Sequence, residues 1–171
     1  YNDPKQLYYT CEVVPGVRLI GLNSNNFNEQ NEQIGRLDEL QLEWLKEVLA
    51  TAREDVILVM IHHNVVEHLP GQSRHKMGRR YMLENAPELL EILRPKVQLV
   101  FTGHLHVQDI AYNQGIYDIT TGSLVSYPHP YRILHFQVDE LGKKRLQVES
   151  NRIDSLPEWP DLLSFSREWM G

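Results

Sequence analysis

Histidines follow two apolar segments of the chain, at the point where each segment ends. The run Val56–Ile61 ends in His62-His63, and residues 97–101 lead into Thr102-Gly103-His104-Leu105-His106. Neutral imidazole is the commonest metal-binding side chain, and an H-x-H pair on an extended stretch sends two rings the same way. The rings of His62, His104 and His106 can therefore converge, which predicts a metal site at the edge of a sheet.

The other histidines and the basic residues near them have simpler interpretations. His68 and His129 are better explained as hydrogen-bonded structural residues, and His135, inside a strand pattern, more so. The loop of residues 64–80 carries a basic cluster that we interpret as a solvated face. Its position directly after His62 keeps open a second interpretation, in which it binds an anion. The members of this basic cluster are Arg74, His75, Lys76, Arg79 and Arg80.

The composition restricts both the kind of metal and the kind of partner. Cys11 is the only cysteine, so the chain has no internal disulfide and no thiolate-rich zinc cluster. The imidazole and oxygen ligands that are left suit Zn, Mn or Fe at a catalytic-type site. The net charge of -6 argues against a nucleic-acid partner, and no apolar run approaches the ~18 residues of a membrane span. With no visible secretory signal, these features predict a cytoplasmic protein.

Two parallel strands must position the histidines. Val56–Ile61 and residues 97–101 show the unbroken apolar pattern of strands that are buried on both faces. A helix over residues 87–93, which Pro95 ends, lies between them in the sequence. This order predicts a right-handed βαβ unit with parallel strands, and ligands gather beyond the carboxyl ends of such strands.

The remaining segments complete a single domain of the α/β class, which we expect to span residues 1–171. Residues 7–14 and 17–22 flank Pro15-Gly16 and predict an antiparallel hairpin that opens into a polar loop at 23–26. Asp38 and Gln41 form a capping box for an amphipathic helix over residues 39–53. After His106, short strands predict a meander, and an amphipathic turn follows from Asp154. The meander strands are expected at residues 107–112, 116–121, 131–138 and 145–149.

In their order and spacing, these motifs resemble those of the calcineurin-like metallophosphoesterases. Ile61-His62-His63 and Gly103-His104-Leu105-His106, each after an apolar strand, resemble the last two motifs of that family. The helix start Gly35-x-Leu37-x-x-x-Gln41-Leu42-x-Trp44-Leu45 is similar to the branch that includes class III cyclic-nucleotide phosphodiesterases. The same branch is resembled by two further segments, Thr121-Gly122-Ser123 and Pro130-Tyr131-Arg132. Together these motifs cover most of residues 17–135.

The resemblance implies a four-layer sandwich of mixed β-sheets flanked by helices, with two divalent metal ions (Mn, Fe or Zn). Such a pair of ions clamps a phosphoester and activates a bridging hydroxide for in-line attack. By position, His62 and His104 would bind one ion and His106 the other. The loops 64–80 and 123–132 would surround a small phosphoester substrate, hydrolysed as by a phosphodiesterase or phosphatase. The side chains implied to line the pocket are those of His63, Asn64 and Ser123.

The sequence also departs from the family pattern. The motifs D-x-H, G-D-x-x-x and G-N-H-D/E, which precede the last two in the family, are not present, so the chain resembles the C-terminal portion with the N-terminal half missing. Asn23 stands where this branch usually has an aspartate. With three imidazoles and no bridging carboxylate, we expect the chain to bind at most one ion, weakly, and to be inactive alone. Asp109 and Asp118 lie near the motif and are possible substitute ligands.

Two other functions compete with the hydrolase. The first is a non-catalytic metallophosphoesterase-like module that binds or regulates a partner, and motifs encoded upstream of Tyr1 would discriminate against it. The second is an amidohydrolase-type metal hydrolase, which the small number of strands and the late H-x-H pair disfavour. Because half of a sandwich exposes strand edges and apolar surface, we also expect a homo-oligomer or a swapped assembly.

Overall fold

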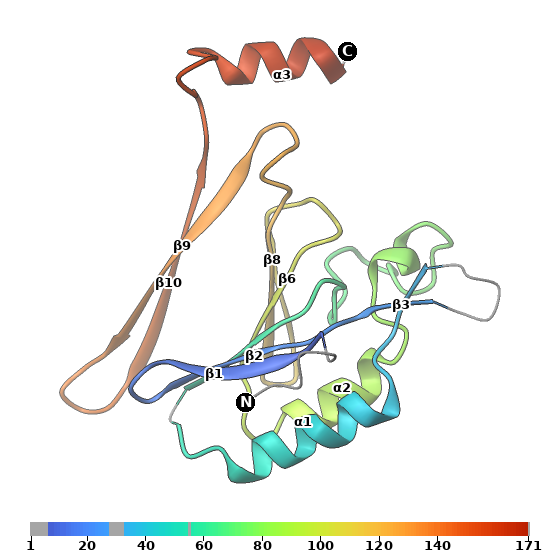
Figure 1. The fold of residues 1–171 in the computed structure, drawn as a ribbon, viewed down its shortest axis with the longest axis vertical. Helices are drawn as coiled ribbons and strands as arrows, with labels where there is room; N and C mark the ends of the chain where they lie inside the picture. Colours follow the sequence, from blue (N-terminus) through green and yellow to red (C-terminus); the bar gives the residue numbers. More distant parts are fainter. Residues whose placement is uncertain (1–6, 28–32, 55, 171) are drawn as a thin grey trace. The chain divides into compact units, whose positions relative to one another are not determined.

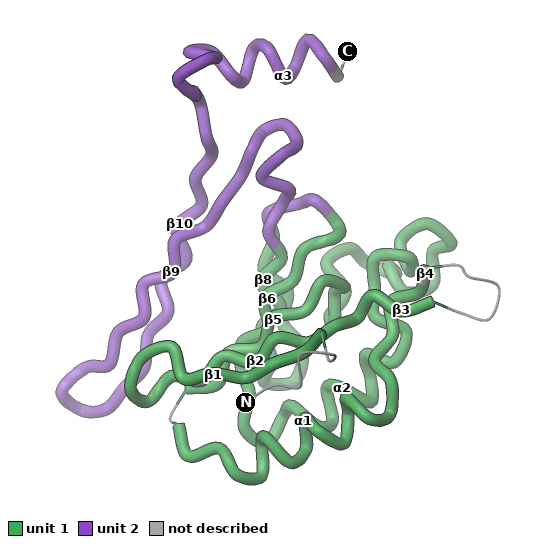
Figure 2. The backbone as a smooth tube through the Cα atoms, viewed as in Figure 1, with its two compact units in different colours: residues 1–105, 109–120 green, residues 106–108, 121–171 purple. Residues whose placement is uncertain are grey.

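The computed structural model describes residues 7–27, 33–54 and 56–170, which form two compact units. Unit 1 contains the described residues up to Leu105 together with Asp109–Thr120, and unit 2 contains His106–Gln108 and the residues from Thr121 onward. Figure 2 shows the two units in different colours.

A mixed six-stranded sheet forms the centre of unit 1. Its strands are β1 (Tyr9–Val14), β2 (Val17–Gly21), β5 (Val56–Met60), β6 (Leu99–Thr102), β7 (Asp109–Asn113) and β8 (Ile116–Thr120). They lie in the order β1-β2-β5-β6-β8-β7, in which β2, β5, β6 and β8 are parallel and the two edge strands are antiparallel to their neighbours. The predicted β1–β2 hairpin and the predicted parallel pairing of β5 with β6 are confirmed.

Two helices cover one face of this sheet. In α1 (Glu39–Thr51) the side chain of Asp38 accepts a hydrogen bond from the backbone N–H of Gln41 at 2.8 Å, as the capping box predicts. Helix α2 (Ala86–Leu93) has Pro87 in its first turn, where a missing N–H costs nothing. Figure 1 shows both helices on the same side of the sheet. The fully buried core that they share with the strands includes Ile20, Leu45, Val59, Leu89, Leu93 and Val100.

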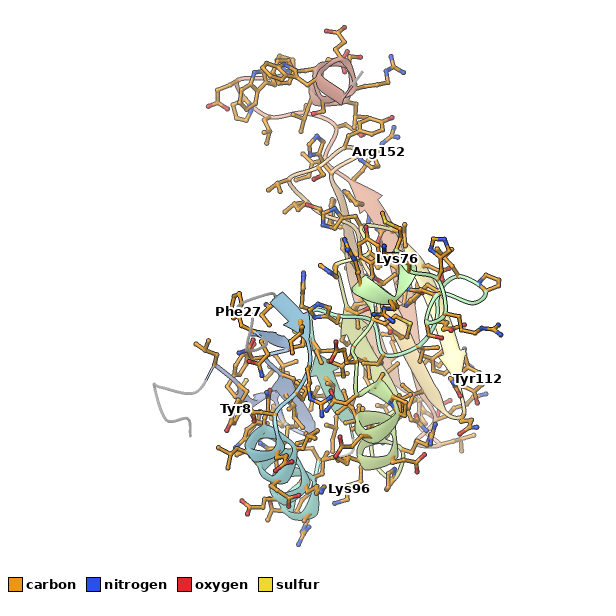
Figure 3. All side chains as sticks on the ribbon, turned by 90° about the vertical axis from the view of Figure 1, so that its right-hand side faces the viewer. Tyr8, Phe27, Lys76, Lys96, Tyr112 and Arg152 are labelled. Carbon is orange, nitrogen blue, oxygen red and sulfur yellow. The ribbon has the colours of Figure 1, made fainter. Side chains whose placement is uncertain are left out.

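A lysine after α2 closes the end of α1. The Nζ of Lys96 donates hydrogen bonds to the backbone carbonyls of Leu49 and Ala52, the latter at 3.3 Å. Lys96 lies beside these helices in Figure 3. The last carbonyls of a helix lack hydrogen-bond partners within the helix. The negative end of the helix dipole also lies there, so a cation is favoured. Lys96 therefore connects the two helices through the backbone of the first.

The structure differs from the expected meander and polar loop. Strand β8 pairs in parallel with β6 and separates it from β7, so the strands after His106 do not lie in sequence order. The expected loop at residues 23–26 contributes β3 (Asn25–Phe27), which pairs with β4 (Gln33–Gly35) as a small antiparallel hairpin. The long loop 64–80 leads into a 3₁₀ turn, η1 (Gly78–Tyr81), which begins at its C-terminal end.

Unit 2 consists of a long hairpin and a terminal helix. Strands β9 (Pro130–Val138) and β10 (Lys144–Arg152) pair antiparallel, and α3 (Leu162–Met170) follows. The buried His129 lies close to the Leu124 carbonyl through Nδ1 (3.0 Å) and to the Ser166 hydroxyl through Nε2 (2.6 Å). His135 is exposed on β9, 3.3 Å from Glu149. These contacts agree with the structural interpretation of both histidines.

The α/β class predicted from the sequence is confirmed, with a mixed sheet flanked by helices. The four-layer arrangement and the single domain over residues 1–171 stay predictions. Within the residues that the structure describes, no helix is both long enough and apolar enough to cross a membrane.

Candidate metal-binding site

Three imidazole rings gather at one edge of the sheet in unit 1. The ring centroids of His62 and His104 lie 4.5 Å apart, and those of His63 and His104 also lie 4.5 Å apart. The rings of His62 and His63 are 5.3 Å apart and nearly perpendicular. The sequence-predicted pair His62 and His104 is therefore brought together, with His63 as their immediate neighbour.

The parallel pairing of β5 and β6 is what places these rings side by side. The ladder continues past the ends of both strands, because the Ile61 N–H donates to the Phe101 carbonyl at 3.0 Å and the Gly103 N–H donates to the His62 carbonyl at 3.1 Å. His62, the last residue of the ladder on one strand, and His104, the residue after Gly103 on the other, then carry their imidazoles at the same edge of the sheet. Parallel strands that end in register thus convert two distant sequence motifs into one cluster.

The backbone of the second motif has an uncommon conformation. His104 and His106 have φ values of 53° and 57°, in the left-handed region. Residues other than glycine adopt this region rarely, although histidine does so more often than most. Such conformations tend to occur at ligand-binding sites, where surrounding contacts hold them. The turn after β6 therefore directs these two side chains in a way that the extended stretch expected from the sequence would not.

His63 is the buried member of the cluster. Its side chain is 2% exposed, and its Nδ1 lies 2.8 Å from the Ser24 hydroxyl. Burial, together with the neighbouring imidazoles of His104 and His62, lowers the pKa of His63 from 6.5 to about 4. The ring is therefore neutral near pH 7. The ring of His63 is buried beside those of His62 and His104, and its predicted place on the lining of a substrate pocket stays a prediction.

The glycine before α1 makes room for this buried ring. A Cβ atom on Gly35 would lie 2.5 Å from Cδ2 of His63, which is closer than real contacts allow. Gly35 was included in the helix-start motif, but its contact with His63 joins residues 28 positions apart and was not visible in the sequence. The fold of β4 thus fixes the position of the His63 ring.

The loop 64–80 returns to the cluster at its far end. The Asn64 N–H donates to the Tyr81 carbonyl and the Leu83 N–H donates to the Asn64 carbonyl, each at 2.9 Å. The ring of Tyr81 lies 5.2 Å from that of His104, a contact that the sequence did not indicate. The side chain of Asn64 is fully buried, and its Nδ2 donates to the Thr102 hydroxyl at 2.7 Å. All members of the basic cluster are exposed, as the solvated-face interpretation requires.

The other four sequence-predicted residues are divided between the two units. His106 and Ser123 belong to unit 2, where His106 is exposed and Ser123 is half-buried. Asp109 and Asp118, the possible substitute ligands, both face His68: the His68 Nδ1 lies 2.8 Å from Asp109 Oδ2, and its Nε2 lies 3.3 Å from Asp118 Oδ1. Their carboxylates are therefore directed to an internal ion-pair network.

The donor set fits a divalent metal only in part. Imidazole nitrogens suit Zn, Mn and Fe, and His62 and His104 place two of them at one edge. In the described ranges 7–27, 33–54 and 56–170, no group of three or more His, Cys, Asp or Glu side chains is arranged to hold a metal ion. Metal sites in proteins normally use at least three protein ligands, so the pair is an incomplete set.

Two curated proteins resemble part of this chain. The 3',5'-cyclic adenosine monophosphate phosphodiesterase CpdA of Escherichia coli K12 is 35% identical over 82 residues, and CpdA of Escherichia coli O157:H7 gives the same values. The matched stretch covers 46% of this chain and 28% of either enzyme. The match therefore spans less than a third of the length of these relatives.

Solved structures share the fold at low sequence identity. A Staphylococcus aureus protein that was assigned as a 5'-nucleotidase aligns with a TM-score of 0.56 and 17% identity, over 99% of this chain and 35% of that protein. GAP50 of Plasmodium aligns with a TM-score of 0.51 and 19% identity, over 71% of this chain and 39% of that protein. These likenesses support the fold.

The sequence pattern of one protein family, the calcineurin-like phosphoesterases, matches residues 4–108. This range holds the strands β2, β5 and β6 and the turns that carry His62, His63 and His104. The resemblance inferred from the two histidine motifs is thereby confirmed. Because the match takes in more than half of the chain and both of its histidine-bearing strand ends, the chain belongs to the calcineurin-like phosphoesterase family.

Proposed function

We propose that this chain is the histidine-bearing part of a metal-dependent phosphoester hydrolase. The observation that carries the proposal is the pair His62 and His104, whose rings lie 4.5 Å apart at the ends of adjacent parallel strands. Family membership and the likeness to a cyclic-nucleotide phosphodiesterase support a phosphoester substrate. A phosphodiester of a small molecule is the substrate class that we favour.

In this proposal His62 and His104 bind one divalent ion, and His106 contributes to a second. Metal ions in such enzymes neutralise the phosphate charge and supply a hydroxide at neutral pH. The neutral His63 supports the other two rings without competing as a cation, because its lowered pKa leaves it uncharged. The exposed basic cluster on the loop 64–80 would attract an anionic substrate. Mn, Fe and Zn all suit these ligands.

The 171 residues alone offer an incomplete ligand set, so we expect them to bind at most one ion, weakly, and to be inactive by themselves. Weak binding follows because two or three imidazoles without a bridging carboxylate give few bonds to each cation. The homo-oligomer, the cytoplasmic location and the identity of the substrate stay predictions. The alternative, a non-catalytic binding module of the same family, predicts no hydrolysis by any form of the protein.

The test measures hydrolysis of bis(p-nitrophenyl) phosphate and of cyclic AMP by the native protein with added Mn²⁺. We expect activity that a chelator removes and Mn²⁺ restores. His104→Ala should lower kcat/KM by more than the ~10–100-fold that loss of an outer-sphere partner costs. His135→Ala is the matched control, because it removes an exposed imidazole on β9 and should leave kcat/KM unchanged.

Two results would decide against the proposal. Activity that His104→Ala leaves intact would mean that the cluster is not the metal site. Absence of hydrolysis in the native protein, with a normal fold, would favour the binding module. Turnover by residues 1–171 alone, if His104→Ala abolishes it and His135→Ala does not, would overturn only the expectation that this chain is inactive by itself.

A further inference from the structure

A buried carboxylate is hydrogen-bonded to both segments that carry the histidine cluster. Asp118 occupies a core-facing position on β8, two residues after Ile116, and both side chains are completely buried. A charge in such a place is costly unless hydrogen bonds and opposite charges compensate it. The groups that donate hydrogen bonds to Asp118 therefore show how its burial is compensated.

The first partners are backbone groups of the segment that follows β5. The Val65 and Val66 N–H groups both donate to Asp118 Oδ2, at 2.7 and 3.0 Å. These residues come three and four positions after His62. Hydrogen bonds from N–H groups to a carboxylate are stronger than bonds between neutral groups. One carboxylate oxygen thus holds the backbone segment that directly follows His62 and His63.

The second oxygen reaches the other histidine motif through a hydroxyl. Thr102, two residues before His104, donates its hydroxyl hydrogen to Asp118 Oδ1, and the same hydroxyl oxygen accepts the Asn64 Nδ2 hydrogen bond at 2.7 Å. Asn64 comes two residues after His62. The chain of bonds Asp118–Thr102–Asn64 therefore spans the two strand ends, and we name these three residues the relay.

The imidazole of His68 lies between the carboxyl groups of Asp118 and Asp109. The His68 side chain is completely buried, with Nε2 3.3 Å from Asp118 Oδ1 and Nδ1 2.8 Å from Asp109 Oδ2. Burial lowers the pKa of His68, but the hydrogen bonds and charges of Asp118 and then Asp109 outweigh burial and raise it. The backbone N–H of His68 donates a hydrogen bond to Gln72 Oε1 at 2.8 Å, which holds His68 in place. When it is protonated, the His68 ring places a positive charge beside the buried carboxyl group of Asp118.

We propose that Asp118 is a positioning residue that sets the distance between the His62 and His104 imidazoles, acting through Thr102 and Asn64. The proposal deepens the proposed function, since the distance matters to chemistry only if these rings bind a metal ion. Outer-sphere groups that orient metal ligands contribute ~10–100-fold to metal affinity in known sites. The relay differs from such groups in that it orients the backbone of two ligands at once.

The test removes the hydroxyl of Thr102 and keeps its shape. Thr102→Val breaks the relay with little change in volume, and Thr102→Ser restores the hydroxyl. Thr10→Val is the control, since the Thr10 hydroxyl donates to the Leu19 carbonyl at 3.1 Å in the same sheet but away from the cluster. Asp118→Asn tests the carboxylate itself, and urea unfolding shows which variants are folded.

Two readouts follow the relay directly. Imidazole ¹H–¹⁵N spectra of His62 and His104 should change in Thr102→Val and stay as in the wild type in Thr102→Ser and Thr10→Val. Hydrogen exchange should show slow Val65 and Val66 amides in the wild type and faster ones in Asp118→Asn. The Zn²⁺ dissociation constant should rise ~10–100-fold in Thr102→Val and recover in Thr102→Ser.

The proposal is overturned if folded Thr102→Val keeps the wild-type imidazole spectra of both histidines and the wild-type Zn²⁺ dissociation constant. It is also overturned if Thr10→Val produces the same changes, because the effect would then be a general loss of stability. Failure to bind Zn²⁺ in the wild type would count against the proposed function alone. In that case the imidazole spectra and the Val65 and Val66 exchange rates still decide whether the relay positions the rings.

Discussion

At the scale of single residues, the cluster depends on a close contact between a glycine and an imidazole. A Cβ on Gly35 would lie 2.5 Å from His63 Cδ2, and the ring is held from another direction by the Ser24 hydroxyl. The ring is buried, so it has little room to move away. Protein interiors are closely packed, so one added methyl group beside a buried ring causes strain.

We predict that Gly35→Ala lowers the free energy of unfolding by ~1–3 kcal/mol, the usual cost of overpacking. Urea denaturation measures this change. The matched control repeats the substitution in a His63→Ala background, in which the conflicting ring is absent and the added Cβ should cost less. Equal costs in the two backgrounds would show that the glycine is needed for a reason other than this contact.

The buried His68 makes stability depend on pH. Its pKa is raised above 6.5 in the folded protein, because the charges and hydrogen bonds of Asp118 and Asp109 outweigh burial. A raised pKa adds stability that is complete below about pH 6.5 and is lost as the pH rises through the folded value. We therefore expect the stability difference between wild type and His68→Gln to be larger at pH 5 than at pH 9. Urea titrations at both pH values measure it, and a difference that grows toward pH 9 would contradict this account.

At the residue scale, the proximity of His62 and His104 could be predicted from the sequence, whereas their role as metal ligands stays a prediction. His62 and His104 end unmistakable apolar runs, so their convergence required only that the two strands be parallel neighbours. The burial of His63 depends on Ser24 and Gly35, which are distant in sequence and have no pattern of their own. Asp118 did carry a signal, since a charged residue two positions after Ile116 on a strand must face the core and needs partners.

At the scale of elements, the side chain of Lys96 links the segment after α2 to the end of α1. Lys96 donates to the last carbonyls of α1 from the segment between α2 and β6. We predict that Lys96→Met, which keeps the apolar stem, lowers the free energy of unfolding by ~0.5–1 kcal/mol. Thermal or urea unfolding measures the loss.

Lys46→Met serves as the control for this prediction. Lys46 lies on the exposed surface of α1 and forms an ion pair with Glu43 in the same helix, a kind of pair that contributes little. Its loss should have a smaller effect than that of Lys96. If both substitutions cost the same, the contribution of Lys96 would be no more than that of an ordinary surface charge.

Elements with strong local signals were predictable and short or non-local ones were not. The capping residue and the spacing of apolar residues predicted α1 to within two residues of its end at Thr51. Strands β3 and β4 have three residues each, too few to show any period. The insertion of β8 between β6 and β7 was missed because alternation indicates that a segment is a strand but not which neighbour it pairs with.

At the scale of the whole molecule, one face of the unit 1 sheet carries exposed apolar side chains. Tyr112 and Tyr117 pack against each other at 4.8 Å and are 60% and 45% exposed, and Met60 on β5 is 46% exposed. Surfaces of this kind, next to an antiparallel edge strand such as β7, favour association. This agrees with the assembly expected from the sequence, which stays a prediction.

We predict that the 171-residue chain associates with itself at tens of micromolar, as measured by sedimentation velocity. Tyr112→Thr should weaken the association. Leu40→Thr, an equally polar change at a side chain that is 78% exposed on α1, should leave it unchanged. A monomer throughout this concentration range, or equal weakening by the two substitutions, would show that the sheet face is not the contact surface.

The closure of the loop 64–80 at Asn64 has a consequence for how this protein can diverge. Because Asn64 is bonded to both Tyr81 and Leu83, the loop leaves the sheet and returns to it at one point. Its tip, residues 73–77, is exposed and includes Lys76, labelled in Figure 3. Insertions and deletions at the tip need not move the histidines, since exposed loop tips tolerate changes of length. Under the proposed function, changes of substrate range can arise at the tip without moving the His62 and His104 rings at its base.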